Sequence, residues 1–114
     1  MRNDRLLVEY LHLIVPKIVH QFSPVTILIS GSRVKGTPTA DSDIDVIIVA
    51  DAFFGVPFVR RMVVVLKSAR FKKHVDYFCY TPEEFEGLKT TSAILRDAVE
   101  GPREVFRMPD TPIR

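Results

Sequence analysis

The chain has one cysteine, little net charge and no long hydrophobic run, and each shortage excludes a class of protein. The single Cys79 cannot form a disulfide within the chain or supply a cysteine metal cluster, and this usage favours the cytoplasm. A net charge of +2 is too small to indicate nucleic acid as a partner. Apolar runs such as "VIIVA" at 46–50 fall far short of the ~20 residues of a membrane span.

The length and the N-terminal segment limit the organisation further. A chain of 114 residues, 46% hydrophobic and 26% charged, has the composition of one globular domain and room for a core. The first twenty residues carry charges and lack a cleavage pattern, so no signal peptide is expected. We therefore expect a single cytoplasmic domain over residues 1–114.

Hydrophobic spacing predicts helices alternating with short strands. Residues 4–20 have helical spacing, which Pro16 should kink or split near Val15. Thr81 is a candidate N-cap, and Glu84 completes a capping box with it. Strands are predicted over 25–30, 43–51 and 74–80. Further helices are predicted over 58–70, 81–88 and 92–100, and the tail from 107 is expected to fray.

The charges are unevenly distributed along the chain. Between Asp51 and Asp76 there are six basic residues and no acid. One interpretation is a solvated helix face, and the other is a surface for phosphate or a partner. The six residues are Arg60, Arg61, Lys67, Arg70, Lys72 and Lys73.

Two aspartates open the second predicted strand, where acidic residues are uncommon. Because side chains alternate along a strand, Asp43 and Asp45 face the same way, with Cα atoms about 6.5–7 Å apart. Like charges this close repel, and a divalent cation between them removes the conflict. Carboxylate oxygens suit Mg²⁺, which takes other ligands from water and phosphates. A turn or cap is the alternative for Asp41 and Asp43, but it explains Asp45 less well.

Other residues are expected at the same edge of the sheet. Asp76 would join the two aspartates if its strand lies beside theirs, and three carboxylates would support two ions about 3.5–4 Å apart. His74 shares a strand face with Asp76 by alternation. Gly31 and Ser32 directly follow the first strand and could approach and hold phosphate oxygens, although a structural turn is the alternative. For Asp76 the alternative is a charge at a strand edge.

These motifs resemble a known family. "GSRVKGTPTADSDIDVIIV" at 31–49 is similar to the signature of polymerase-beta-like nucleotidyltransferases, a Gly-Ser pair followed after about ten residues by Asp-x-Asp in an apolar strand. "VDYFCYTPEEFEGL" at 75–88 resembles the third-aspartate strand and helix of the minimal, stand-alone members. The resemblance covers most of residues 4–106. It implies an α/β (α+β) fold in which helices cover a small mixed sheet of three or more strands.

The resemblance also implies roles for residues and the ligands they would hold. Two Mg²⁺ ions and a nucleoside triphosphate, ATP or another NTP, would bind, and a nucleoside monophosphate would be transferred with release of pyrophosphate. The catalytic metal ligands would be Asp43, Asp45 and Asp76. The nucleotide-binding residues would be Gly31, Ser32, Lys35 and Ser42.

Minimal members are often paired with a separate HEPN-type toxin, and they act as its antitoxin by attaching AMP to a tyrosine. We expect such a HEPN-type protein partner here. A homodimer is an option, because so small a fold can leave apolar surface exposed. Two alternatives remain open: a non-catalytic interaction module that neutralises a partner by binding, and a small-molecule nucleotidyltransferase acting on an antibiotic.

Overall fold

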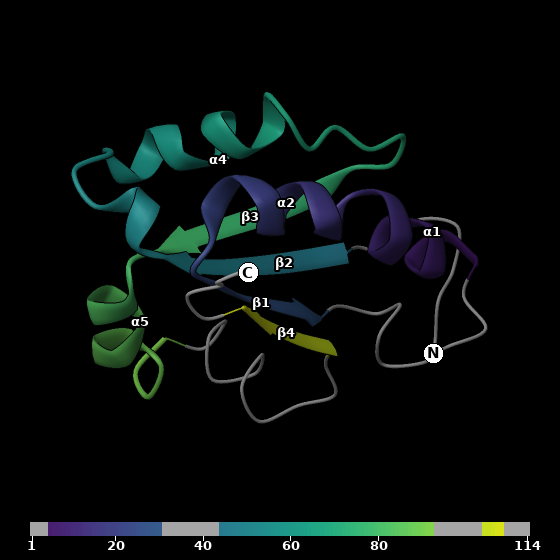
Figure 1. The fold of residues 1–114 in the computed structure, drawn as a ribbon. Helices are drawn as coiled ribbons and strands as arrows, with labels where there is room; N and C mark the ends of the chain where they lie inside the picture. Colours follow the sequence, from purple (N-terminus) through teal and green to yellow (C-terminus); the bar gives the residue numbers. More distant parts are fainter. Residues whose placement is uncertain (1–4, 31–43, 93–103, 109–114) are drawn as a thin grey trace.

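A computed structural model describes residues 5–30, 44–92 and 104–108, which form helices packed on a four-stranded sheet (Figure 1). The strand order is β3-β2-β1-β4, with β2 and β3 parallel and β1 antiparallel to both of its neighbours. The predicted mixed sheet of three or more strands is thereby confirmed. The strands are β1 (Val25–Ser30), β2 (Ile44–Ala50), β3 (Val75–Tyr80) and β4 (Glu104–Met108).

The helices connect these strands in the order that the sequence predicts. The parallel pair β2 and β3 needs a crossover connection, and α4 supplies it. The short 3-10 helix η1 (Asp51–Phe53) precedes α4, and Gly55, with φ of 83°, makes the turn between them. The helices are α1 (Arg5–Leu13), α2 (Val15–Phe22), α4 (Phe58–Leu66) and α5 (Pro82–Leu88).

The break in the first helical segment is confirmed. α1 ends at Leu13 and α2 begins at Val15, with Pro16 in the first turn of α2. Proline has no amide hydrogen to donate, so the hydrogen-bond ladder is interrupted there. The two short helices can therefore follow the twisted sheet, and each places apolar side chains on it. The buried residues are Leu7, Tyr10, Val15, Ile18 and Phe22.

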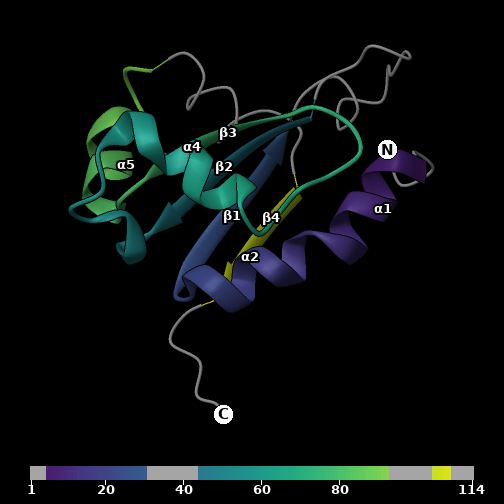
Figure 2. The ribbon, with the colours of Figure 1, turned by 90° about the horizontal axis from the view of Figure 1, so that it is seen from above.

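Both faces of the sheet are covered, by different helices. Figure 2 shows α1, α2 and α4 over one face, and α5 lies on the other side in Figure 1. The main core lies under α1, α2 and α4, where Ile27, Val46 and Ile48 point. Leu28 and Ile47 point to the opposite face, where Phe85 of α5 packs. No helix in this described part of the chain is long and apolar enough to cross a membrane.

The sequence prediction was wrong in two places. The helix predicted over 58–70 ends at Leu66, and the chain then turns through residues 67–74. The tail expected to fray from 107 begins inside β4, which pairs antiparallel with β1 in a register that sets Ile27 opposite Phe106. Pairing with a distant strand creates this element, so local pattern gives little sign of it. The predicted helix over 92–100 lies, except for Ser92, outside the described residues.

Candidate functional site

Two of the three predicted metal ligands lie side by side on neighbouring strands. Asp45 in β2 and Asp76 in β3 are register partners in the parallel pair. Adjacent strands lie about 4.8 Å apart, and partners in register project from the same face. By alternation this is the face of Ile47, opposite α1, α2 and α4. Both aspartates are half-buried, so they occupy neighbouring, partly solvent-accessible positions on this face.

His74 makes the contact that the shared strand face suggested. Its Nε2 lies 2.7 Å from Asp76 Oδ1, and a carboxylate accepts, so the ring nitrogen donates. The Asp76 side chain is 38% exposed and that of His74 is 74% exposed. The carboxylate of Asp76 is therefore oriented by a neighbour and still reachable from solvent.

The C-terminal end of β1 lies beside Asp45. Ser30, its last residue, pairs with Asp45 in the antiparallel β1–β2 register. The segment 31–43 joins Ser30 to Ile44, so both of its ends are attached beside Asp45. This segment holds the other predicted site residues, which lie outside the described residues: Gly31, Ser32, Lys35, Ser42 and Asp43.

A carboxylate pair suits a hard divalent cation through the chemistry of its oxygens. Asp45 and Asp76 fit that description, as two adjacent acids that would otherwise repel. Within residues 5–30, 44–92 and 104–108, no three His, Cys, Asp or Glu side chains come together as a metal site. A third protein ligand, such as Asp43, would have to come from outside these ranges.

A buried tyrosine pair supports β3 next to Asp76. The hydroxyls of Tyr10 in α1 and Tyr77 in β3 lie 2.7 Å apart, and Tyr77 also donates to the carbonyl of Ala69 at 3.4 Å. Burial raises the pKa of both phenols, so they stay neutral donors and acceptors. This pair fixes α1 against the strand that carries Asp76, and it was not predicted from the sequence.

The loop between α4 and β3 brings cations near the start of β3. It borders an open pocket of about 200 Å³ lined by residues 69–75 together with Leu66 and Tyr77. Lys72 pairs there with Glu9 of α1 at 2.9 Å. Arg70 is exposed and Lys73 is half-buried. Arg70, Lys72 and Lys73 therefore lie on a solvated loop and not on the solvated helix face that was one interpretation of the basic run.

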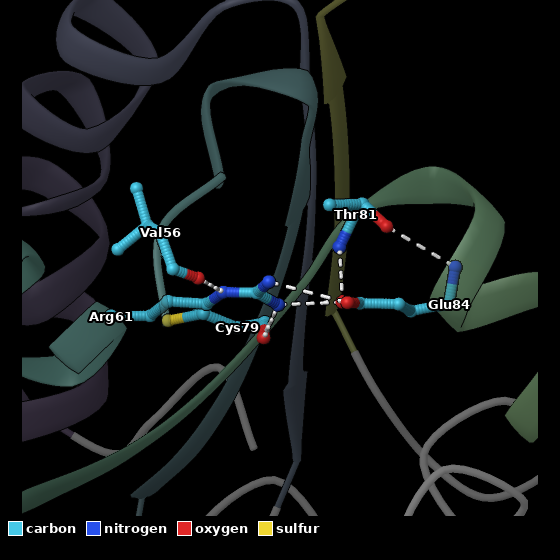
Figure 3. A network of polar contacts seen from close by, with 5 residues as sticks. All are labelled: Val56, Arg61, Cys79, Thr81 and Glu84. Atoms are coloured by element: carbon cyan, nitrogen blue, oxygen red, sulfur yellow. Dashed lines mark hydrogen bonds and ion pairs between the residues drawn. The ribbon is translucent and has the colours of Figure 1, made fainter. Parts of the chain in front are cut away.

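Arg61 departs from the solvated-face interpretation more strongly, because it is 5% exposed (Figure 3). Its guanidinium donates to the carbonyls of Val56 and Cys79 at 2.9 and 3.1 Å. It also forms a two-pronged ion pair with Glu84 of α5 at 2.5 and 3.2 Å. The Phe53 and Phe58 rings lie 5.9 and 5.6 Å from the guanidinium carbon.

The Arg61 network sits at the end of β3 away from Asp76 and ties α4 to α5. Glu84 Oε1 accepts from the Thr81 amide at 2.9 Å, and Thr81 Oγ1 accepts from the Glu84 amide at 3.2 Å. The predicted capping box is thus confirmed. The hydrogen bonds from Arg61 hold the pKa of Glu84 below its usual range. Burial raises the pKa of Cys79 to about 12.

Comparisons with solved structures agree with this fold. A candidate nucleotidyltransferase from Sulfolobus solfataricus has a TM-score of 0.59 and 24% identity, over 90% of this chain and 79% of that chain. A second candidate nucleotidyltransferase has a TM-score of 0.50 and 20% identity, over 82% of this chain and 90% of that one. At these identities the likeness establishes the fold alone. No curated protein matches the chain.

The family is identified by the sequence match. The family model for the nucleotidyltransferase domain matches residues 13–101, which include both strands of the aspartate pair and the Gly-Ser segment. The chain therefore belongs to the nucleotidyltransferase domain family, whose members are enzymes that transfer nucleotidyl groups.

Proposed function

We propose that this chain transfers a nucleoside monophosphate, AMP from ATP, to a hydroxyl group in a reaction that depends on Mg²⁺. The observation that carries the proposal is the register of Asp45 with Asp76 on adjacent parallel strands. A Mg²⁺ ion in a phosphate site takes one or two carboxylate ligands from the protein and the rest from water and phosphates, and Asp45 and Asp76 could supply these carboxylates. Membership of the nucleotidyltransferase family makes a triphosphate the natural ligand.

Different residues of the chain would bind the metal ions, orient a carboxylate and bind the phosphates. Asp45 and Asp76, joined by Asp43 from outside the described ranges, would be the ligands of two ions. Mg²⁺, when bound, would neutralise the triphosphate and make the acceptor hydroxyl more acidic. His74 would hold one oxygen of Asp76 and so orient its carboxylate. The phosphates would be bound by Gly31, Ser32, Lys35 and Ser42.

The reaction would be an in-line displacement. The acceptor oxygen forms a bond to the α-phosphorus of ATP, and the bond from that phosphorus to the oxygen bridging to the β-phosphate breaks. Pyrophosphate leaves, and the proton of the acceptor hydroxyl passes to water. Catalysis of this kind comes from positioning and charge neutralisation, so the adjacent carboxylates would account for most of it.

For the acceptor, we propose a tyrosine hydroxyl on a HEPN-type partner protein, which AMP attachment would inactivate. The support is the resemblance of residues 31–49 and 75–88 to minimal members that act as antitoxins. The competing proposal is neutralisation by binding alone, with little turnover, and the exposed apolar face of α4 described below favours it. The two proposals predict different behaviour of a chain that lacks one carboxylate.

The test is co-expression of this chain with a HEPN-type protein, followed by intact-mass measurement of the partner. The proposal predicts a mass increase of one AMP group on the partner, on a tyrosine, with the unchanged chain. Asp45→Asn should abolish the adduct. Asp51→Asn is the matched control, because Asp51 is exposed just past the far end of the same strand. Protection by Asp45→Asn without any adduct would instead support neutralisation by binding.

A further inference from the structure

The outer face of α4 is apolar and faces solvent. Seven large hydrophobic residues are exposed in the described part of the chain, and five of them gather in η1, α4 and the turn between them. Val59 is 83% exposed and Val63 is 53% exposed, one helical turn apart. Phe58 and Met62 adjoin them, and Phe54 precedes the helix. Clustered apolar exposure of this kind marks an interaction surface, unlike isolated exposed residues.

Arg61 and Val65 explain why this face points outward. They are the buried residues of α4, and they lie one turn apart on the side opposite Val59 and Val63. The Arg61 side chain is held by Val56, Cys79 and Glu84, so the helix cannot rotate without breaking these bonds. The apolar face is therefore fixed in the exposed position by a polar anchor beneath it.

Positive charge borders the apolar face. At 100° per residue, Arg60 and Lys67 lie along the same edge of α4, next to Val63, and both are exposed. An open groove of about 660 Å³ adjoins the end of α4, bordered by Ser68 and by residues of α2: Pro16, Lys17, His20 and Gln21. The sequence has no Asp or Glu between residues 9 and 41 or between residues 51 and 76. The surface formed by α2 and α4 is consequently free of acids.

We propose that the outer face of α4, with the groove beside α2, binds an amphipathic helix of another protein that carries an apolar row flanked by Asp or Glu. An apolar helix row would cover Val59, Met62 and Val63, and carboxylates along its edge would meet Arg60 and Lys67. A second copy of this surface could not provide those carboxylates. An anionic bilayer could meet the cations, but a flat surface would leave the groove unfilled.

This inference goes beyond the proposed nucleotide transfer, because helix binding at α4 requires no nucleotide. α4 covers the sheet face opposite the one on which Asp45 and Asp76 project. A partner held on α4 would thus leave the carboxylate side of the sheet open. Failure of one proposal would not decide the other.

The test is selection from a displayed library of single helices, randomised at surface positions, against the purified full chain without nucleotide. Enriched helices should carry apolar residues at i, i+3 or i+4 and i+7, with an excess of Asp and Glu on one flank. Val59→Glu should weaken the best binder at least tenfold. Leu88→Glu, a matched change at an exposed leucine of α5, should leave its affinity unchanged. Arg60→Glu together with Lys67→Glu should reverse the flank preference toward Lys and Arg.

Several results would overturn this proposal. If no selected helix required Val59 for binding, a helix-binding surface would be excluded. If the selected helices carried basic residues on their flanks, the charge argument would be wrong. If sedimentation of the chain alone showed self-association that Val59→Glu abolishes, the occupant would be a second copy and the proposal would be wrong. Binding to phosphatidylserine vesicles that Val59→Glu abolishes, with no helix selected, would identify a membrane instead.

Discussion

Asp45 and Asp76 come from positions 31 residues apart, and only the parallel register brings them together. From the sequence one can infer that Asp43 and Asp45 share a strand face, because this follows from local alternation. The neighbour of Asp45 across the sheet depends on the α4 crossover, which local pattern does not specify. The resemblance of 75–88 to a known strand and helix supplied the missing step for Asp76.

The burial of Arg61 and that of Cys79 differ in how far they could be inferred from the sequence. For the basic run that includes Arg61, the sequence left open a solvated helix face or a surface for phosphate or a partner, and neither includes the burial of Arg61, because its partners are not close in sequence. Its ion-pair partner Glu84 is 23 residues away, and two other partners are backbone carbonyls. Cys79 is a small buried side chain of β3, on the same face of the strand as the buried Val75 and Tyr77.

Cys79 gives a prediction at this scale. Burial raises the pKa of its thiol to about 12, so at pH 8 only roughly one thiol in ten thousand would be the reactive thiolate. The native protein should therefore resist a thiol-specific reagent at pH 8 and react once per chain in guanidinium chloride. Rapid stoichiometric labelling of the native protein would contradict the burial of this strand.

At the scale of elements, the boundaries with a local chemical cause could be predicted, and those set by packing could not. Pro16 breaks the first helical segment, and Thr81 with Glu84 starts α5, as predicted. β4 depends on its pairing with β1, and just after α4 ends at Leu66 the chain contacts distant segments, Ser68 with Gln21 and Ala69 with Tyr77. The outward apolar face of α4 belongs to the second group, since Arg61 determines which side is buried.

The link between α4 and α5 predicts acid-sensitive stability. Glu84→Gln should lower the free energy of unfolding at pH 7 by about 1–3 kcal/mol, because the buried Arg61 loses its charged partner. The value should fall in the lower part of this range, since the Glu84 side chain is 42% exposed and screened by water. Glu83→Gln, at an exposed glutamate of the same helix turn, should cost less than half as much.

The stability difference between the wild type and Glu84→Gln should decrease as the pH falls. The pKa of Glu84 is lowered in the folded state, so its contribution is complete above the ordinary glutamate value of about 4.3. It is lost as the pH falls from there through the lowered pKa. Urea unfolding of the wild type and Glu84→Gln at pH 7 and pH 3 measures this. If the wild type and Glu84→Gln differed in unfolding free energy by the same amount at pH 7 and at pH 3, the ion pair would contribute nothing.

For the whole molecule, the two proposed sites lie on opposite faces of the sheet. The carboxylate pair projects from one face at the start of β2 and β3, and the exposed surface of α4 lies over the other. The sequence predicted the first region through its motif, whereas for the second it indicated only a basic run, including Arg60 and Lys67, that a partner could contact. The motif is a local property of residue types and spacing, whereas an exposed face depends on how the entire chain packs.

We propose above all that the aspartate pair belongs to a working nucleotide site. The most direct measurement is calorimetric titration of ATP into the purified chain, with and without Mg²⁺, beside Asp45→Asn, Asp76→Asn and the control Asp51→Asn. We expect ATP binding that requires Mg²⁺, is lost in Asp45→Asn and Asp76→Asn, and persists in Asp51→Asn. Binding unaffected by Asp45→Asn and Asp76→Asn, or no binding to the wild type, would contradict it.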